Sequence, residues 1–81
     1  MTATVKHWTT PARPGVDVRG YRTTVTIVGA GYTTAITLAG NLTRKQALTA
    51  VYDDLARESD RWSTEFLRRL RALADGKAVN A

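Results

Sequence analysis

Cysteine is absent from the 81 residues of this chain, so neither a disulfide framework nor a thiolate metal site can stabilise its small core. No apolar run approaches the ~20 residues that a membrane-spanning helix requires. The N-terminus also lacks the basic and then apolar pattern of a signal peptide. These absences predict a cytoplasmic protein that does not insert into a membrane.

Residue types that support catalysis are scarce. His7 is the only histidine, and one histidine without a cluster of carboxylates beside it forms neither a metal site nor a catalytic triad. Asp53 and Asp54 are adjacent, so on a helix their side chains would point about 100° apart and could not act as a facing pair. We therefore expect that the protein is not an enzyme and needs no metal or cofactor.

The hydrophobic content is an ordinary 43%, which predicts a folded chain and not a disordered one. A chain of this length makes one small domain with a thin core, and a homodimer would add buried area. The net charge is +5, from 12 basic and 7 acidic residues. Arginine forks match phosphate and guanine edges, but a moderate positive charge also keeps a small protein soluble, and both interpretations remain open.

Residues 1–15 are polar and contain both prolines, and they are predicted to form a flexible arm. Within this arm, Thr4–Trp8 is a candidate short strand. Lys6 and Arg13 are the arm residues predicted to contact a phosphate. Trp8 lies outside any strong pattern and is a candidate for an exposed anchor at an interface.

Residues 16–39 are rich in Thr, Val and Ile that alternate along the chain, which favours strand over helix. A short glycine-rich connection divides this region into two extended segments. If Gly29 opposes Tyr32, then Val25 opposes Ile36 and the apolar side chains of both segments share one face. We therefore predict an antiparallel β-hairpin whose apolar face covers the following helices.

Residues 43–75 carry two amphipathic helical patterns that are joined by a polar break at Glu58-Ser59-Asp60. Thr43 and Gln46 fit a capping box for the first helix, which is expected over Arg44–Arg57. The prediction for the whole chain, residues 1–81, is a single α+β domain. In it, an antiparallel β-hairpin or a three-stranded sheet packs on two C-terminal helices.

The second helix is expected to start at a cap formed by Ser59 or Asp60. Its apolar stripe, expected to face the core, consists of Trp62, Phe66, Leu70 and Leu73. Gly76 is a natural C-terminal stop, and residues 76–81 are expected to form a frayed tail.

The opposite face of the second helix is rich in arginine. The cluster consists of Arg61, Arg68, Arg69 and Arg71. Glu65 lies among them and is expected to pair with Arg61 or Arg69. The arginines either contact phosphate groups, each of which adds to the salt dependence of binding, or form a solvated face that Glu65 and Asp75 balance.

The segment Leu55–Leu73 reads LARESDRWSTEFLRRLRAL and resembles the second half of ribbon-helix-helix DNA-binding proteins. The resemblance lies in Leu55-Ala56-Arg57-Glu58, in the polar break, and in the apolar spacing of Phe66, Leu67 and Leu70. In that family a strand precedes two helices, and two chains pair their strands into a ribbon that reads the major groove. The resemblance implies that phosphate is held around Arg61–Thr64, with Ser63 and Thr64 among its contacts. Tyr21–Glu58 is slightly similar to HicB-type antitoxins.

The sequence therefore predicts a small, homodimeric DNA-binding regulator that contacts phosphate through its arginine cluster. The alternative is a protein-interaction module, an inhibitor or adaptor that binds an acidic protein. Two tryptophans in so short a chain support this alternative.

Overall fold

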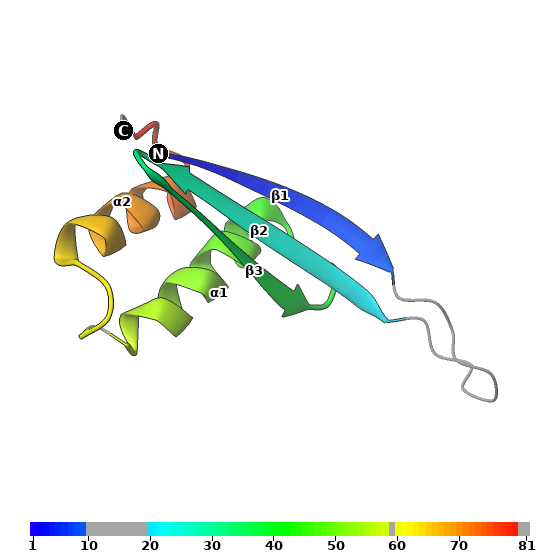
Figure 1. Cartoon of the computed structure of the whole chain (residues 1–81). Coiled ribbons are helices and arrows are strands. Elements are labelled where there is room, and N and C mark those ends of the chain that lie inside the picture. The colour runs from blue at the N-terminus through cyan, green and yellow to red at the C-terminus, as the bar shows by residue number, and fades with distance from the viewer. Residues whose placement is uncertain (10–19, 59, 80–81) are drawn as a thin grey trace.

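A computed structural model of the chain describes residues 1–9, 20–58 and 60–79. Their elements are β1 (Thr2–Thr9), β2 (Tyr21–Gly29), β3 (Tyr32–Ala39), α1 (Arg44–Ala56) and α2 (Thr64–Ala74). The strands form one antiparallel sheet in the order β1-β2-β3, and both helices lie on the same side of it (Figure 1). The predicted α+β class is confirmed, with three strands in the sheet and the helices C-terminal.

The N-terminal segment is a strand of the sheet. β1 pairs with β2 along its whole length, and Met1 and Ala3 are buried in the core, which holds the strand in place. The candidate strand Thr4–Trp8 was therefore correct in kind but too short, and the prediction of a flexible arm is wrong for residues 1–9. Arg13 lies outside the described residues.

β2 and β3 pair in the predicted register, with Gly29 opposite Tyr32 and Val25 opposite Ile36. Gly31 in the turn has φ of 79°, a conformation that glycine adopts without steric cost. At Gly29 a Cβ would lie 2.2 Å from the ring of Tyr32, so a larger residue there would require this ring to move. The Tyr32 side chain therefore lies across the backbone of Gly29.

The core lies between the sheet and the two helices. Val25 and Ile27 of β2 are fully buried, and burial of side chains of this size stabilises a fold by about 1.5–3 kcal/mol each. Thr23 is buried on the same face, where its hydroxyl donates to the Gly40 carbonyl at 2.8 Å and accepts from the Leu42 N–H at 3.0 Å. The helices contribute Ala47, Leu48, Val51, Leu55, Phe66, Leu70, Leu73 and Ala74.

The predicted capping box of α1 is confirmed. The Gln46 N–H donates to the Thr43 hydroxyl at 3.2 Å, and the Thr43 N–H donates to the Gln46 side-chain oxygen at 3.0 Å. The helix ends at Ala56, one residue before the predicted end, and Arg57 is its C-cap. Among the described residues, no helix is long and apolar enough to cross a membrane.

α2 begins later than predicted. Its cap is Ser63, whose hydroxyl accepts a hydrogen bond from the Phe66 N–H at 3.1 Å, and not Asp60, while Ser59 lies outside the described residues. Trp62 therefore precedes the helix, although its ring stacks on Phe66 with 4.9 Å between centroids. The prediction failed because Trp62 lies four residues before Phe66, which is also the spacing of a helical stripe.

The chain leaves α2 at Gly76, which has φ of 81°, as predicted for a helix stop. The Lys77 N–H closes the last turn by donating to the Ala72 carbonyl at 2.9 Å. Beyond it, Val79 packs against the core, and its carbonyl accepts from the Met1 amino group at 3.4 Å. The prediction of a frayed tail is therefore wrong as far as Val79.

Candidate functional site

The predicted arginine cluster lies at the surface of the helical half. Arg68, Arg69 and Arg71 belong to α2, whereas Arg61 lies in the connection before it, contrary to the prediction that it is part of the helix. The side chains of Arg61, Arg68 and Arg71 are more than half exposed, at 77%, 74% and 55%, and that of Arg69 is 39% exposed. None of the four is buried.

Each of these arginines is paired with a nearby carboxylate. The pairs are Arg61–Glu58 at 3.8 Å, Arg68–Glu65, Arg69–Glu65 at 3.1 Å and Arg71–Asp75 at 3.6 Å. The predicted pair of Glu65 with Arg69 is confirmed, and the alternative pair with Arg61 is wrong. Exposed pairs of this kind contribute about 0–1 kcal/mol, so a phosphate can displace them, but they reduce the local positive charge.

Ser63 and Thr64 form the start of α2 beside Arg61 in the chain. The Ser63 hydroxyl is already engaged, because it accepts the capping hydrogen bond from Phe66. Thr64 is exposed on the first turn. A phosphate-binding role for these two residues, which the ribbon-helix-helix resemblance implies, stays a prediction.

The net charge is concentrated in the other half of the molecule. Residues 1–45 contain six basic side chains and one acidic side chain, whereas residues 46–81 contain six of each. The whole net charge of +5 therefore belongs to the strands, their connection and the first residues of α1. This difference in net charge can be counted from the sequence alone. The run of arginines in α2 instead suggests that the positive charge lies in the helical half.

Alternate residues of the three strands point away from the helices, because Thr23, Val25 and Ile27 between them point into the core. We call this surface the outer face. It consists of Thr2, Thr4, Lys6, Trp8, Arg22, Thr24, Thr26, Val28, Thr33, Ala35, Thr37 and Ala39. The outer face has two basic side chains and no acidic one.

One end of the outer face is basic and aromatic. Lys6 lies opposite Thr24, and Trp8 lies opposite Arg22 on the neighbouring strand. Trp8 is 44% exposed, and its ring N–H donates to the Thr24 hydroxyl at 2.8 Å, which fixes the indole on the face. No carboxylate of the described residues forms a salt bridge with Lys6 or Arg22. We call Lys6, Trp8 and Arg22 the basic end.

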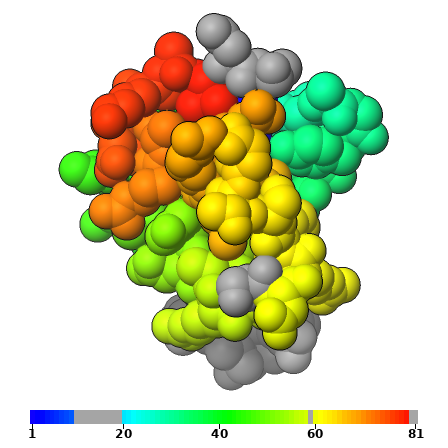
Figure 2. Space-filling view, turned by 90° about the vertical axis from the view of Figure 1, so that its left-hand side faces the viewer, coloured from blue at the N-terminus to red at the C-terminus, as the bar shows by residue number. Residues whose placement is uncertain are grey.

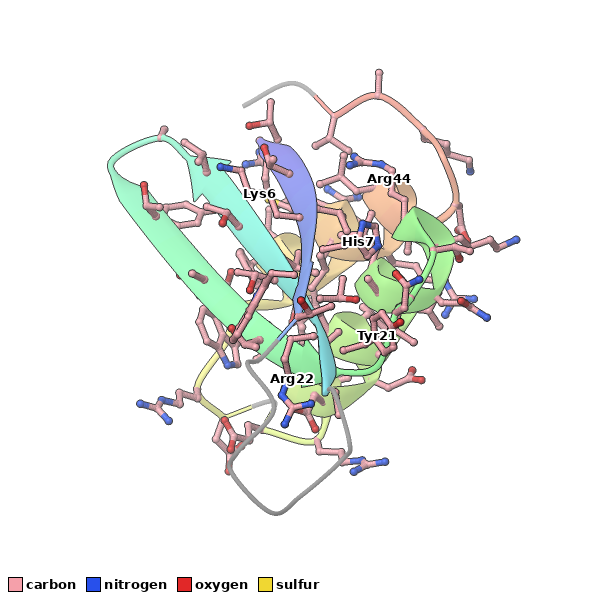
Figure 3. The ribbon with its side chains drawn as sticks, turned by 90° about the vertical axis from the view of Figure 1, so that its right-hand side faces the viewer. Lys6, His7, Tyr21, Arg22 and Arg44 are labelled. Carbon is pink, nitrogen blue, oxygen red and sulfur yellow. The ribbon has the colours of Figure 1, made fainter. Side chains whose placement is uncertain are left out.

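The opposite side of β1 is tied to the start of α1. The Arg44 guanidinium donates to the Ala3 carbonyl at 2.7 Å, and the His7 ring nitrogen Nε2 hydrogen-bonds to the Leu42 carbonyl. Figure 3 shows His7 and Arg44 on the α1 side of the sheet and Lys6 and Arg22 on the other side. His7 therefore has a structural contact, and Arg44 joins the edge of the sheet to the helix.

A second surface feature lies where the β2–β3 turn meets α2 (Figure 2). Tyr32, Trp62 and Phe66 line a shallow cavity of about 260 Å³ together with Arg61, Ser63, Glu65 and Arg69. The Tyr32 and Phe66 rings meet edge to face at 5.8 Å. Trp62, expected in the core, is half-buried against it, and its ring N–H is a buried donor with no hydrogen-bond partner among the described residues.

A comparison with protein-family models, curated proteins and solved structures finds no match to this chain. The resemblances to ribbon-helix-helix proteins and to HicB-type antitoxins therefore stay predictions. Within the described ranges, no group of three or more His, Asp or Glu side chains is placed to hold a metal ion.

Proposed function

We propose that this chain is a small DNA-binding protein that contacts nucleic acid through the basic end of its outer face. The observation that carries the proposal is the partition of charge. The net charge of +5 falls in residues 1–45, and the outer face has two basic side chains that form no salt bridge with a carboxylate of the described residues. DNA carries a dense line of negative charge, so a surface of this kind attracts it at low salt.

The residues of the basic end have complementary roles in this proposal. Lys6 and Arg22 contact phosphate groups, because neither engages a carboxylate of the described residues. Trp8, which lies opposite Arg22 and two residues after Lys6, offers a partly exposed ring on which a base or sugar can stack. The neighbouring threonine hydroxyls donate to and accept from phosphate oxygens and sugars.

The arginine cluster of α2 takes a secondary role. A phosphate that binds Arg68 or Arg71 first has to displace Glu65 or Asp75. Displacement costs little for exposed pairs, but the carboxylate stays nearby and repels the phosphate. We therefore rank these contacts below those of Lys6 and Arg22. We further propose that the protein acts as a regulator in the cytoplasm.

The test is a salt-titrated binding measurement with labelled duplex and single-stranded DNA. The double variant Lys6→Gln/Arg22→Gln removes two charges from the outer face, and Arg68→Gln/Arg71→Gln removes two from α2 as a matched control. We expect the first variant to lose more than about tenfold in affinity at low salt and to lower the salt slope by about 2. The control should change affinity by less than about threefold.

Two outcomes contradict the proposal. If the unaltered protein does not bind DNA at about 50 mM salt, where phosphate contacts are strongest, DNA binding is excluded. If the α2 variant loses as much affinity as the outer-face variant, the assignment to the basic end is wrong.

The second candidate function is a protein-interaction module, and the aromatic cavity favours it. Trp62 supplies a half-buried ring there, and Arg61 and Arg69 also line the cavity. Such a site suits an apolar side chain beside an acidic group. A pull-down after nuclease treatment separates the two candidates, because recovery of nucleic acid alone counts against a protein partner.

A further inference from the structure

The outer edge of β3 presents a row of unpaired backbone groups. The Gly40 N–H donates to the Tyr21 carbonyl at 2.8 Å, which fixes the alternation of hydrogen bonds between β2 and β3. Every second residue of β3 therefore directs its N–H and carbonyl away from β2. These residues are Thr33, Ala35, Thr37 and Ala39. Within the described residues, no other segment pairs with this edge.

The two edges of the sheet differ in their protection. On β1, the Arg44 guanidinium occupies the Ala3 carbonyl, His7 contacts the Leu42 carbonyl, and Lys6 adds a charge. On β3, the eight residues Tyr32–Ala39 contain no charged residue, no proline and no glycine. Natural edge strands carry such features to prevent pairing, so their absence on β3 marks this edge as a site for another strand.

Charge identifies the occupant of this edge. The stretch Thr23–Thr43 contains no Asp, Glu, Lys, Arg or His, in a chain with a net charge of +5. Two copies of the chain therefore repel each other least where β3 faces β3. An acidic partner or DNA would find no basic side chain on this edge. A second copy of the chain is therefore the favoured partner. Its own β3 edge is also uncharged, and it offers N–H and carbonyl groups that can pair with those of the first copy.

We propose that β3 pairs antiparallel with β3 of a second copy across a two-fold axis. The pairing joins the sheets into one, with three strands from each copy. In this pairing, a residue whose side chain points toward the helices lies opposite a residue of the second copy that also points toward its helices. The helices of both copies then lie on the same side of the joined sheet. The half-exposed side chains of Ile36 and Leu38 then gain apolar neighbours from the second copy.

The assembly closes at two copies. At the edge of β1, Arg44 already occupies the Ala3 carbonyl and Lys6 adds a charge, so this edge is the less favourable one for pairing. A sheet with one open edge forms a closed dimer and not a filament. This inference does not rest on DNA binding, although the dimer would bring two outer faces into one surface.

The test is the mass of the protein in solution, measured by sedimentation across a concentration series. Ala35→Pro removes an edge N–H without touching the ladder to β2, and Ala35→Val at the same position keeps that N–H. We expect the unaltered protein and Ala35→Val to be dimers and Ala35→Pro to be a monomer. A second variant, Ala35→Lys, places like charges across the edge and should also give a monomer.

Hydrogen exchange separates loss of pairing from loss of folding. In the Ala35→Pro variant, the amides of Thr33 and Thr37 should exchange at least about tenfold faster than in the unaltered protein. Those of Thr34 and Ile36, which face β2, should remain protected. An unaltered protein that stays monomeric throughout the series, or an Ala35→Pro variant that stays dimeric with its β2-facing amides protected, would overturn the proposal. Neither measurement involves DNA, so the two proposals fail separately.

Discussion

The helical half and the sheet half each contain six or more charged side chains, yet they present different surfaces. In residues 46–81 the six basic residues meet six acidic ones, and every arginine of the α2 cluster has a carboxylate within 4.0 Å. In residues 1–45 the basic residues outnumber Asp17 by five. A run of arginines in a sequence is therefore a weaker sign of a positive surface than a few basic residues on a strand without acidic neighbours.

The largest effect is expected where the two halves meet. Ile27→Ala should lower the free energy of unfolding by about 2–5 kcal/mol, because Ile27 is fully buried between β2 and the helices. Val28→Ala, one residue further on and 43% exposed, is the control and should cost well under about 1 kcal/mol. Urea unfolding measures both changes. Equal losses would mean that the sheet does not pack on the helices through this face.

An intermediate effect is expected at the start of α2, which positions the arginine cluster. Ser63→Ala should lower the free energy of unfolding by about 1 kcal/mol, because the Phe66 N–H loses its acceptor. Asp60→Ala should cost less than about 0.5 kcal/mol, because Asp60 is exposed and is not the cap. Urea unfolding of both variants shows which residue caps α2. A larger loss of stability for Asp60→Ala would mean that α2 begins at Asp60 and not at Ser63.

The smallest effect is expected when one carboxylate that pairs with the arginines of α2 is removed. Glu65→Gln frees Arg68 and Arg69 from their shared carboxylate, and we expect affinity for DNA at low salt to rise by about threefold. Asp54→Asn makes the same change in net charge, but no salt bridge joins Asp54 to a basic residue of the described segments. A fluorescence binding titration compares the two variants. An equal rise in both would mean that only net charge matters.

The features that were predicted correctly depend on residues close together in the chain. The hairpin register followed from the alternation of Val25 and Ile27 and the short connection after Gly29. The α1 capping box involves two residues three positions apart, Thr43 and Gln46. In such cases the local pattern leaves few alternatives.

The features that were missed depend on distant partners or on an ambiguous spacing. β1 is a full strand because β2 pairs with it and the core covers Met1 and Ala3, neither of which the first residues reveal. The start of α2 was misplaced because Trp62 packs on Phe66 at a helical interval without being helical. The basic end joins Lys6 and Arg22 only through strand register, so no contiguous motif marks it.

The chain has two tryptophans, one in each half, and this gives each half its own optical signal. The indole of Trp8 is 44% exposed, so iodide in solution should quench it and a nucleic acid bound at the basic end should shield it. The indole of Trp62 lies half-buried against Phe66, and its emission should shift only when α2 leaves the core. With one tryptophan replaced at a time, a single fluorometer can follow binding and unfolding separately in the same solution.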